Sequence, residues 1–558
     1  MENQERAIGK VSATEKNPST TDEFYFWTDK DEVLSPFDIV KVKHLPGDET
    51  WTYGEVQEIN HVTDAQSHFT SFISSDFGDK ESSIGNMNRL GMNYVKAKVI
   101  CNTDDIYMPV LDGKQVFLCT EDDISYALGL KGVRNPIVCG YLQMYKGKDA
   151  LKIPVSLNEN FLIGPEGAHL NVSGISGLAA KTSYSMFLLN ALQQKYMKDG
   201  KNDVAFVFFN VKGRDLLAID EANTELKDKD RQLYEDLGLE AKPFQNVRYF
   251  YPYADSTKKI LSNADPADFK RQQAEKKAFV YKVPCDKYLP MLDLLLANED
   301  DSTGTMESCV NYIINHQGNF SNVNTWETLM ETVEKYAKSS ANKSVDDKNN
   351  PISSLSWRKF YRLINKLVKT QGVFNDNIND GEKDLGSEIK DNLVGGQVMM
   401  IDITSLDENT QSFVFGSVIR SIWEMKFNTE RDNVPKKVVI FVDELNKYAS
   451  SDTPKNSPIL HQLLDITERG RSLGIVLFSV EQFRSAINVR VKGNCATAAY
   501  GRTNAVEVSK EDYRYIPKVY QNMMTRLPAG EYIISNPALR SLVRVKFPYN
   551  TYRQFPNG

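Results

Sequence analysis

The chain has 558 residues, 41% of them hydrophobic, so it can bury more than one core and we expect two or three domains. Its net charge of −7 argues against a surface coated in basic side chains for non-specific nucleic-acid binding, but it leaves a locally basic channel open. The six cysteines show no C-x-x-C spacing, and no apolar run reaches eighteen residues. We therefore expect a cytoplasmic protein with reduced thiols and without a zinc site, a disulfide framework or a membrane span.

Residues 1–33 begin with a polar, charged segment that lacks an apolar targeting region, and we expect this part of the chain to be flexible. From residue 34 to residue 155 the pattern is strand-like. Short β-rich runs such as "FDIVKVKH", "TYGEVQEIN" and "NYVKAKVICN" are separated by Gly, Asp and Asn turns. Several short strands at close spacing, with few helical periods, predict a small β-barrel.

The pattern changes to alternating strands and helices after residue 156. An apolar run, a Gly/Ser-rich turn and the helix-spaced segment "YSMFLLNALQQKYM" lead into "DVAFVFFNV", which is typical of a buried parallel strand. Residues 220–392 are mostly helical and charged, and the strand-like runs "QVMMIDI", "KVVIFVDE", "GIVLFSV" and "NCATAAYG" follow. We predict an α/β fold in which residues 156–219 and 393–558 form one parallel sheet, interrupted by a helical insertion at 220–392.

The stretch "HLNVSGISGLAAKTSY" places a strand, a tight Gly turn and a helix start in the order that a phosphate-binding loop requires. In such loops, backbone N–H groups and a Lys hold the phosphates, and a hydroxyl ligates magnesium. The stretch departs from G-x-x-x-x-G-K-[ST], because Ala precedes the Lys and the first Gly lies seven residues before it. An incidental Lys after a Gly-rich turn is the alternative. The candidate nucleotide-binding residues are Gly174, Ser176, Gly177, Ala180, Lys181, Thr182 and Ser183.

A second motif, "KKVVIFVDELNKY", favours an NTPase. Its apolar strand would deliver Asp443 to the shell of a magnesium ion that Thr182 also ligates, and would place Glu444 to orient or deprotonate the attacking water. An isolated acidic pair after a strand can instead be a helix N-terminal signal. Because both motifs occur in the expected order on a βα pattern, we predict an ATP hydrolase that uses ATP and Mg²⁺.

The order of these motifs resembles the HerA/FtsK class of P-loop ATPases, and most closely HerA-like proteins. The resemblance extends from the barrel region through "GGQVMMIDITSLDENTQSFVFGSVIRSIWE" and "ITERGRSLGIVLFSVEQF" to "LPAGEYIISNPALRSLVRVKF". It covers nearly the whole chain and is weakest in the helical segment and the first thirty residues. It implies a HAS-barrel-like N-terminal domain and a RecA-like ATPase domain.

The resemblance also implies roles for single residues. Gln482 falls where the family has a polar sensor of the γ-phosphate or the lytic water, and a polar strand cap is the alternative. Arg469 and Arg471 lie where HerA-like proteins carry basic residues near a subunit boundary, so one of them could act in a neighbouring site. A helix-dipole partner and a surface ion pair are the alternatives.

Two positions depart from the family pattern. Asn210 and Arg214 stand where the family shows acids, and Asp215 could substitute by a shift of one residue. Together with the altered phosphate loop, this departure puts the rate of hydrolysis in question more than the binding of nucleotide.

For DNA, the relevant stretch is "QFRSAINVRVKGN", which contains Arg484, Arg490 and Lys492. In a ring, a few basic residues per subunit repeat around the pore, so phosphate contacts can add up without a basic monomer. A solvated basic loop is the alternative.

The resemblance implies a hexameric ATP-dependent motor that threads double-stranded DNA and has no membrane segment. It also implies a partner effector, a nuclease or a sirtuin-like NAD-consuming enzyme, that docks on the barrel, as in bacterial anti-phage defence or DNA processing. The alternative is an ATP-binding hexameric scaffold that organises an effector with little or no translocation. A monomeric P-loop kinase or GTPase is a third possibility.

Overall fold

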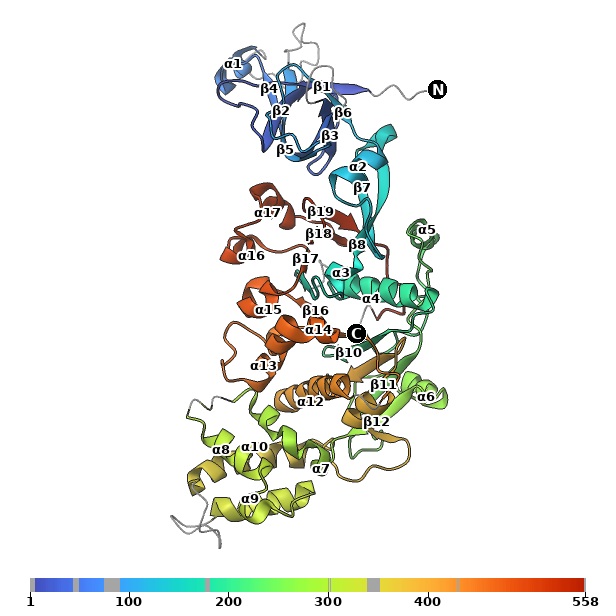
Figure 1. The fold of residues 1–558 in the computed structure, drawn as a ribbon, viewed down its shortest axis with the longest axis vertical. Helices are drawn as coiled ribbons and strands as arrows, with labels where there is room; N and C mark the ends of the chain where they lie inside the picture. The colour runs from blue at the N-terminus through green and yellow to red at the C-terminus, as the bar shows by residue number, and fades with distance from the viewer. Residues whose placement is uncertain are drawn as a thin grey trace.

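The computed structural model describes residues 6–43, 50–74, 91–175, 181–299, 301, 303–338, 352–428 and 431–555. The molecule is elongated, with a small barrel at one end, a large sheet in the middle and a cluster of helices at the other end (Figure 1). Within the described ranges, no helix combines the length and the apolar character that a membrane crossing needs. The expected α/β fold class, with an N-terminal barrel and a sheet dominated by parallel strands, is confirmed.

The N-terminal strands close into a barrel in the order β1-β2-β5-β4-β3-β6. Alternation along β2 turns Phe24 and Phe26 into the barrel core, beside Val40 and Val95. The barrel and its two flanking helices are β1 (Ala7–Val11), β2 (Glu23–Thr28), β3 (Ile39–Lys43), β4 (Trp51–Thr63), α1 (His68–Ser74), β5 (Gly91–Asn102), β6 (Gln115–Leu118) and α2 (Glu121–Ala127).

This barrel corrects two expected boundaries. Strands β1 and β2 lie within residues 1–33, which we expected to be flexible; polar neighbours hide their short apolar pattern, and pairing with β5 and β6 stabilises them. Residues 1–5 lie outside the described ranges. At the other end, β7 (Pro136–Met144) and β8 (Leu151–Asn158) belong to the central sheet rather than to the barrel.

The central sheet has thirteen strands. From β13 to β17 neighbouring strands run parallel, and β18, β19, β7 and β8 extend the sheet with antiparallel pairs. In spatial order they are β13 (Glu382–Asp384), β12 (Ala278–Lys282), β11 (Val247–Pro252), β14 (Val398–Asp402), β10 (Val204–Asn210), β15 (Lys437–Asp443), β16 (Ile475–Glu481), β9 (Leu170–Ser173), β17 (Thr497–Tyr500), β18 (Glu531–Ser535), β19 (Val543–Lys546), β7 and β8.

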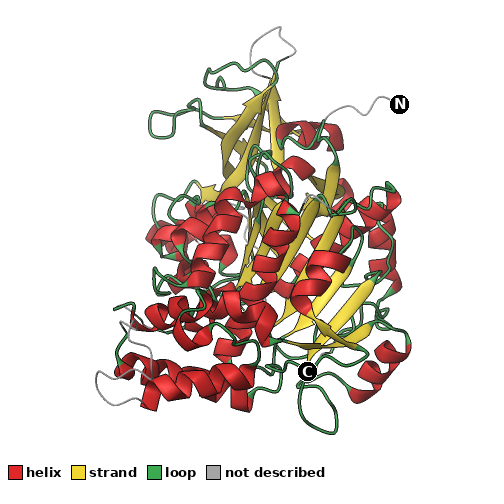
Figure 2. Cartoon of the chain, turned by 60° about the horizontal axis from the view of Figure 1, so that its bottom comes forward, coloured by secondary structure: helices red, strands yellow, loops and turns green. Residues whose placement is uncertain are grey.

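Both faces of this sheet are buried, as alternation along β10 shows. Phe206 and Phe208 belong to the apolar cluster on the side of α4 (Lys181–Lys198), whereas Val207 and Phe209 belong to the cluster on the side of α12 (Glu408–Phe427). The strands therefore lie between helices (Figure 2). The other surrounding elements are η1 (Gly147–Asp149), α3 (Glu159–Leu162), α5 (Asp228–Asp236), α6 (Pro266–Ala274), η5 (Leu445–Lys447), α13 (Pro458–Asp465), the π-helix η6 (Ile466–Gly470), α14 (Arg471–Leu473), η7 (Arg484–Ala486), α15 (Val489–Gly493), α16 (Ala505–Val508), η8 (Glu511–Tyr513) and α17 (Lys518–Met524).

The helical insertion is shorter than expected. It lies between β12 and β13 and packs around Trp357, which is fully buried and stacks on Phe320 at a ring distance of 5.5 Å. The expected insertion at 220–392 also holds β11, β12 and β13. Charged neighbours hide the short apolar runs of β11 and β12, and the sequence of β13, EKD, is polar. Pairing of β11 with β14, of β12 with β11 and of β13 with β12 adds all three strands to the sheet. The helices between β12 and β14 are α7 (Cys285–Tyr288), η2 (Leu289–Leu296), α8 (Thr305–Ile314), η3 (Gly318–Phe320), α9 (Trp326–Lys338), α10 (Ser354–Thr370), α11 (Leu385–Ser387) and the π-helix η4 (Glu388–Asn392).

Buried polar contacts join the barrel to the sheet. The Tyr520 hydroxyl donates to Glu55 Oε1, and Ser541 Oγ donates to Glu55 Oε2 at 2.9 Å. Asp38 accepts the backbone N–H of Tyr145 at 3.1 Å, which links the start of β3 to the end of β7. Each contact spans two parts of the chain that are far apart in sequence.

Candidate active site

Three parallel strands end at one edge of the sheet. In the register of the sheet, Asp443 of β15 pairs with Val480, and Glu481 of β16 pairs with Ser173 of β9. Ligands of open α/β sheets bind outside the carboxyl ends of the strands, so we expect a ligand-binding site at this edge. Helix α4 begins beyond it, at Lys181.

The start of the predicted phosphate loop is held by its neighbours. The N–H of Gly174 donates to the carbonyl of Glu481 at 3.2 Å, and the N–H of Ile175 donates to the carbonyl of Arg502 at 2.8 Å. The predicted loop residues Ser176, Gly177 and Ala180 lie outside the described residues, so their roles stay predictions.

The first turn of α4 is firmly placed. Tyr184 is buried, stacks on Tyr532 at a ring distance of 4.5 Å and donates its hydroxyl to the carbonyl of Cys139 at 3.1 Å. Lys181 is 6% exposed, and Ser183 is half-buried. A long cationic side chain is rarely buried unless it is paired, so the position of Lys181 is unusual and suits a group that binds an anion.

The hydroxyl of Thr182 donates to Asp443 Oδ2 at 2.7 Å, which joins the two sequence motifs directly. Asp443 is itself buried. Mg²⁺ prefers oxygen ligands at about 2.0–2.1 Å in octahedral geometry, so two neighbouring ligand oxygens lie about 2.9 Å apart. The donor chemistry and spacing of Thr182 and Asp443 therefore fit a magnesium ion whose other ligands come from phosphate and water.

Glu444 has a left-handed backbone, with φ of 55°. Such a conformation costs about 1–3 kcal/mol for a residue other than glycine. Its N–H donates to Asp443 Oδ1 at 2.8 Å, so the turn also fixes that carboxylate. The Glu444 carboxylate forms ion pairs with Lys212 at 3.7 Å and Lys447 at 3.3 Å.

Glu481, which the sequence reasoning missed, is the buried side chain at the end of β16, whereas Gln482 is exposed. Successive side chains of a strand point to opposite sides, so a shift of one residue exchanges a buried side chain for an exposed one. Burial raises the pKa of the Glu481 carboxyl to about 8, and the charges of Arg484, Lys181 and Lys492 partly oppose this rise. A carboxylate that ends the apolar run "GIVLFSVE" was the signal that could have found it.

The hydrogen bonds of Asn210 explain why an amide, and not an acid, occupies this position. Its Nδ2 donates to Asp402 Oδ1 at 2.9 Å, to Thr404 Oγ1 at 2.8 Å and to the carbonyl of Gly213 at 3.1 Å. An acid at position 210 could not donate and would face the carboxylate of Asp402. The asparagine at position 210 therefore has a structural role, because it joins β10 to β14. Asp215, the possible substitute acid, lies exposed in the following loop.

Arg469 and Arg471 lie at the opposite edge of the sheet, at the N-terminal end of β16. Both are exposed, and Arg469 forms an ion pair with Asp465 at 3.8 Å. The seven residues of β16 span about 20 Å, so neither arginine reaches the carboxyl edge of β9, β15 and β16 in the same chain. A catalytic role for either one requires a second chain and stays a prediction.

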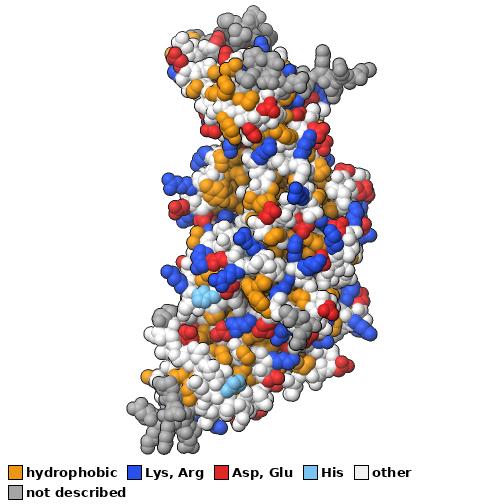
Figure 3. All heavy atoms as spheres, viewed as in Figure 1, with side chains coloured by type: hydrophobic (Ala, Val, Ile, Leu, Met, Phe, Trp, Pro, Cys, Tyr) orange, Lys and Arg blue, Asp and Glu red, His pale blue; other side chains and the backbone are white. Residues whose placement is uncertain are grey.

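The three predicted DNA-binding residues differ in exposure. Arg490 is exposed and forms an ion pair with Glu468 at 2.6 Å. Arg484 and Lys492 are buried: Arg484 donates to Asn171 and lies over the ring of Tyr500, and Lys492 pairs with Asp512. This burial argues against the expected DNA contacts of Arg484 and Lys492, because both side chains already have partners inside the fold. On the face shown in Figure 3, basic and acidic side chains intermingle.

No protein-family model matches the sequence, and no curated protein matches it. Among solved structures, the chain is similar to the unbound bacterial conjugative coupling protein TrwB, at 13% identity and a TM-score of 0.42 over 72% of this chain and 89% of that chain. It is similar to VirB4 of Thermoanaerobacter pseudethanolicus, at 12% identity and a TM-score of 0.41 over 75% and 98% of the two chains.

A third similar structure is the genome packaging NTPase B204 from Sulfolobus turreted icosahedral virus 2 in complex with sulfate. The identity is 14% and the TM-score 0.22, over 30% of this chain and 72% of that chain. At these scores, a functional conclusion depends on the residues of this chain.

Proposed function

We propose that this chain is an ATP hydrolase that uses Mg²⁺ at the carboxyl edge of β9, β15 and β16. The observation that carries the proposal is the 2.7 Å hydrogen bond between Thr182 and Asp443, formed beside the buried Lys181. It brings a helix-start hydroxyl and a strand-end carboxylate together, which is the arrangement that magnesium-dependent phosphoryl transfer uses.

The residues have separate roles in this proposal. Lys181 and the backbone of the preceding loop hold the phosphates of ATP, and Thr182 and Asp443 hold Mg²⁺, which neutralises charge on the transferred phosphoryl group. Glu444 orients the attacking water once its carboxylate is no longer held by Lys212 and Lys447. Arg469 or Arg471 of a neighbouring subunit completes the site.

The resemblance to HerA-like proteins extends the proposal to a cytoplasmic hexameric motor on double-stranded DNA. In a ring, Arg490 repeats around the assembly and adds phosphate contacts without a basic monomer. The closed barrel, at one end of the molecule, offers a docking place for an effector such as a nuclease or a sirtuin-like enzyme (Figure 1). An anti-phage role belongs to this extension.

The test is hydrolysis of ATP by the purified full chain with and without Mg²⁺. Phosphate release should fall by about tenfold or more in Lys181→Ala and in Glu444→Gln. Lys198→Ala, at the exposed far end of the same helix, is the matched control and should keep full activity. Wild-type turnover equal to that of both site variants would contradict the motor. Mass measurement of the chain, alone and with co-expressed genomic neighbours, tests ring formation and the effector.

A nucleotide-binding scaffold is the second candidate, and the ion pairs of Glu444 with Lys212 and Lys447 favour it. A carboxylate held by two ammonium groups is poorly placed to activate water. The scaffold predicts ATP binding and effector activation with little DNA movement. Displacement of a third strand from duplex DNA separates the two candidates, because only a motor displaces it.

A further inference from the structure

The C-terminal tail, residues 547–555, connects two segments of the proposed site. The ring of Phe547 lies 5.1 Å from that of Tyr184, in the first turn of α4. Further along, the Asn223 side chain donates to the carbonyl of Asn550 at 2.8 Å, and Tyr552 forms an antiparallel bridge with Ala222. The tail thus passes from the phosphate-binding helix to the loop that follows β10.

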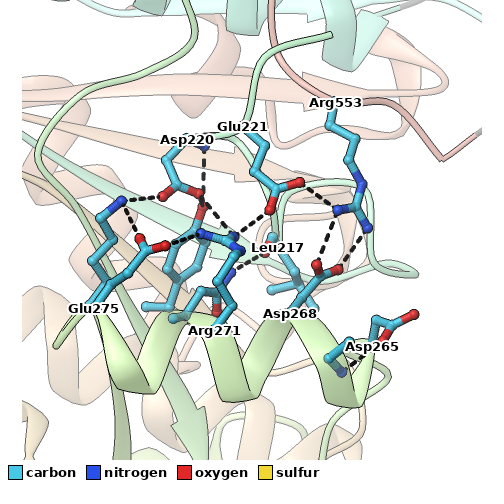
Figure 4. A network of polar contacts seen from close by, with 12 residues as sticks. Leu217, Asp220, Glu221, Asp265, Asp268, Arg271, Glu275 and Arg553 are labelled. Atoms are coloured by element: carbon cyan, nitrogen blue, oxygen red, sulfur yellow. Dashed lines mark hydrogen bonds and ion pairs between the residues drawn. The ribbon is translucent and has the colours of Figure 1, made fainter. Parts of the chain in front are cut away.

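Arg553 fixes the end of the tail (Figure 4). Its guanidinium donates to both oxygens of Asp268, at 3.0 and 2.7 Å, and also to Glu221. Its backbone N–H donates to the carbonyl of Glu221 at 2.8 Å. Arg271 pairs with the same Glu221 at 2.6 Å, so the carboxylates hold two arginines at once. Bidentate arginine contacts of this kind set orientation as well as position.

Two guanidinium groups lie over the ring of Phe555. The Cζ of Arg553 is 4.6 Å from the ring centroid, and the Cζ of Arg214 is 4.8 Å from it. The charge of Arg553 is compensated by Glu221 and Asp268, which limits repulsion between the two cations. In the described part of the chain no carboxylate is within ion-pair distance of Arg214, so the ring is a main partner of its charge.

Arg214 lies in the loop between β10 and residue 222, which carries Lys212 to Glu444. The loop is anchored near its start, where Asn210 Nδ2 donates to the carbonyl of Gly213, and near its end, where the Tyr249 hydroxyl donates to Asp220 Oδ1 at 2.6 Å. Between these anchors, the stack of Arg214 on Phe555 connects the loop to the tail.

We propose that Phe555 is a positioning residue, whose ring holds Arg214 and thereby the loop 211–221 that brings Lys212 to Glu444. The C-terminal tail then sets the place of the carboxylate that orients water, although no tail residue touches the reacting atoms. This inference rests on the proposed function for its catalytic consequence, and on the contacts of Arg214 and Phe555 for its structural part.

The first test is steady-state ATP hydrolysis by Phe555→Ala in the full chain. We expect kcat to rise roughly fivefold, because Lys212 no longer holds the Glu444 carboxylate, while KM for ATP changes by less than about twofold, since Lys181 and Thr182 are untouched. Phe555→Trp should restore kcat, because any large aromatic face can hold the guanidinium. Gln554→Ala is the matched control; its side chain donates to the carbonyl of Tyr552 at 3.2 Å and lies next to Phe555 in sequence. An unchanged kcat in Phe555→Ala would overturn the proposal.

A double-mutant cycle tests the path through Arg214. Arg214→Met keeps a similar stem but removes the cation, and the Arg214→Met/Phe555→Ala double variant should gain no more kcat than either single variant. Gains that multiply would show that the two residues act independently and would overturn the positioning role.

Hydrogen exchange separates this inference from the proposed function. In Phe555→Ala we expect amide exchange in residues 211–221 to rise at least about threefold, with residues 170–175 unchanged. This result is expected even if the wild type hydrolyses no ATP, in which case the proposed function fails and the structural part of the inference stands. Exchange in 211–221 equal to that of the wild type would overturn it.

Discussion

The buried carboxylates at the junction of the barrel and the sheet differ in their hydrogen bonds from the buried carboxylate of Glu481. Where the barrel meets the sheet, Glu55 accepts from Tyr520 and Ser541, and Asp38 accepts the backbone N–H groups of Ser35 at 2.7 Å and Tyr145 at 3.1 Å. At the carboxyl edge of β9, β15 and β16, the proposed nucleotide edge, neither oxygen of Glu481 forms a close hydrogen bond within the described residues, although the residue is fully buried. The Asn171 side chain and the charges of Arg484, Lys181 and Lys492 only partly stabilise this carboxylate.

The difference shows which cluster is structural. Burial raises the pKa of Asp38 to about 6 and that of Glu55 to about 7, with hydrogen-bond donors opposing the rise, and it raises that of Glu481 to about 8. A buried polar group without a partner costs about 1–3 kcal/mol. The carboxylates with hydrogen-bond donors thus join the barrel to the sheet, whereas the Glu481 carboxylate makes this edge a candidate functional site.

The largest effect should come from Thr182→Val at the nucleotide edge. Losing the hydroxyl that contacts Asp443 should lower magnesium-dependent phosphate release about a hundredfold, because charge on the phosphoryl group is no longer stabilised. Thr370→Val on the exposed end of α10 is the control. Equal rates of phosphate release for Thr182→Val and wild type would contradict the proposed role of Thr182 in magnesium-dependent hydrolysis.

Glu481→Gln should change how stability depends on pH. The folded-state pKa of Glu481, about 8, lies above the ordinary 4.5, so the folded chain binds more protons than the unfolded chain between these values. Wild-type stability should therefore fall as the pH rises from about 5 to about 8, on the order of 3–4 kcal/mol, relative to the variant. Thermal unfolding of both proteins across this range measures it, and parallel curves would contradict the assignment.

Tyr520→Phe should remove a hydrogen-bond donor from the buried carboxylate of Glu55, so that this carboxylate becomes more like that of Glu481. Removing the hydroxyl leaves Glu55 Oε1 without that donor, so we expect the free energy of unfolding to fall by about 1 kcal/mol. Denaturant titration measures the change, with the highly exposed Tyr107→Phe as the control. A variant as stable as wild type would show that the donors at the junction contribute nothing.

The smallest effect on stability should come from Arg490→Ala. Its pair with Glu468 is exposed, so the free energy of unfolding should change by less than about 1 kcal/mol. If Arg490 contacts a DNA phosphate, affinity should fall similarly for all sequences and the salt slope should drop by about one. Binding titrations at several salt concentrations decide this, and an unchanged slope would remove Arg490 from the DNA contacts.

Much of the fold was predictable, because the barrel and sheet strands are local apolar runs. The phosphate-loop motif and the motif "KKVVIFVDELNKY" named Thr182 and Asp443, which the structure brings within hydrogen-bond distance. Strands β11 and β12 were missed since their apolar runs are short and lie among charged helices, and β13 was missed since its sequence EKD is polar. The burial of Arg484 and Lys492 was missed because basic residues in a loop are usually solvated, and only their partners Asn171 and Asp512 show otherwise.

The sequence by itself determined the strand and helix types and the candidates at the strand ends, because hydrophobic periodicity and Gly-rich turns act over a few neighbouring residues. Only the tertiary structure decided that β9 lies between β16 and β17, that Glu481 and not Gln482 is buried at the edge, and that Phe555 contacts Arg214. These facts depend on strand register and on contacts between distant segments, which no local pattern specifies.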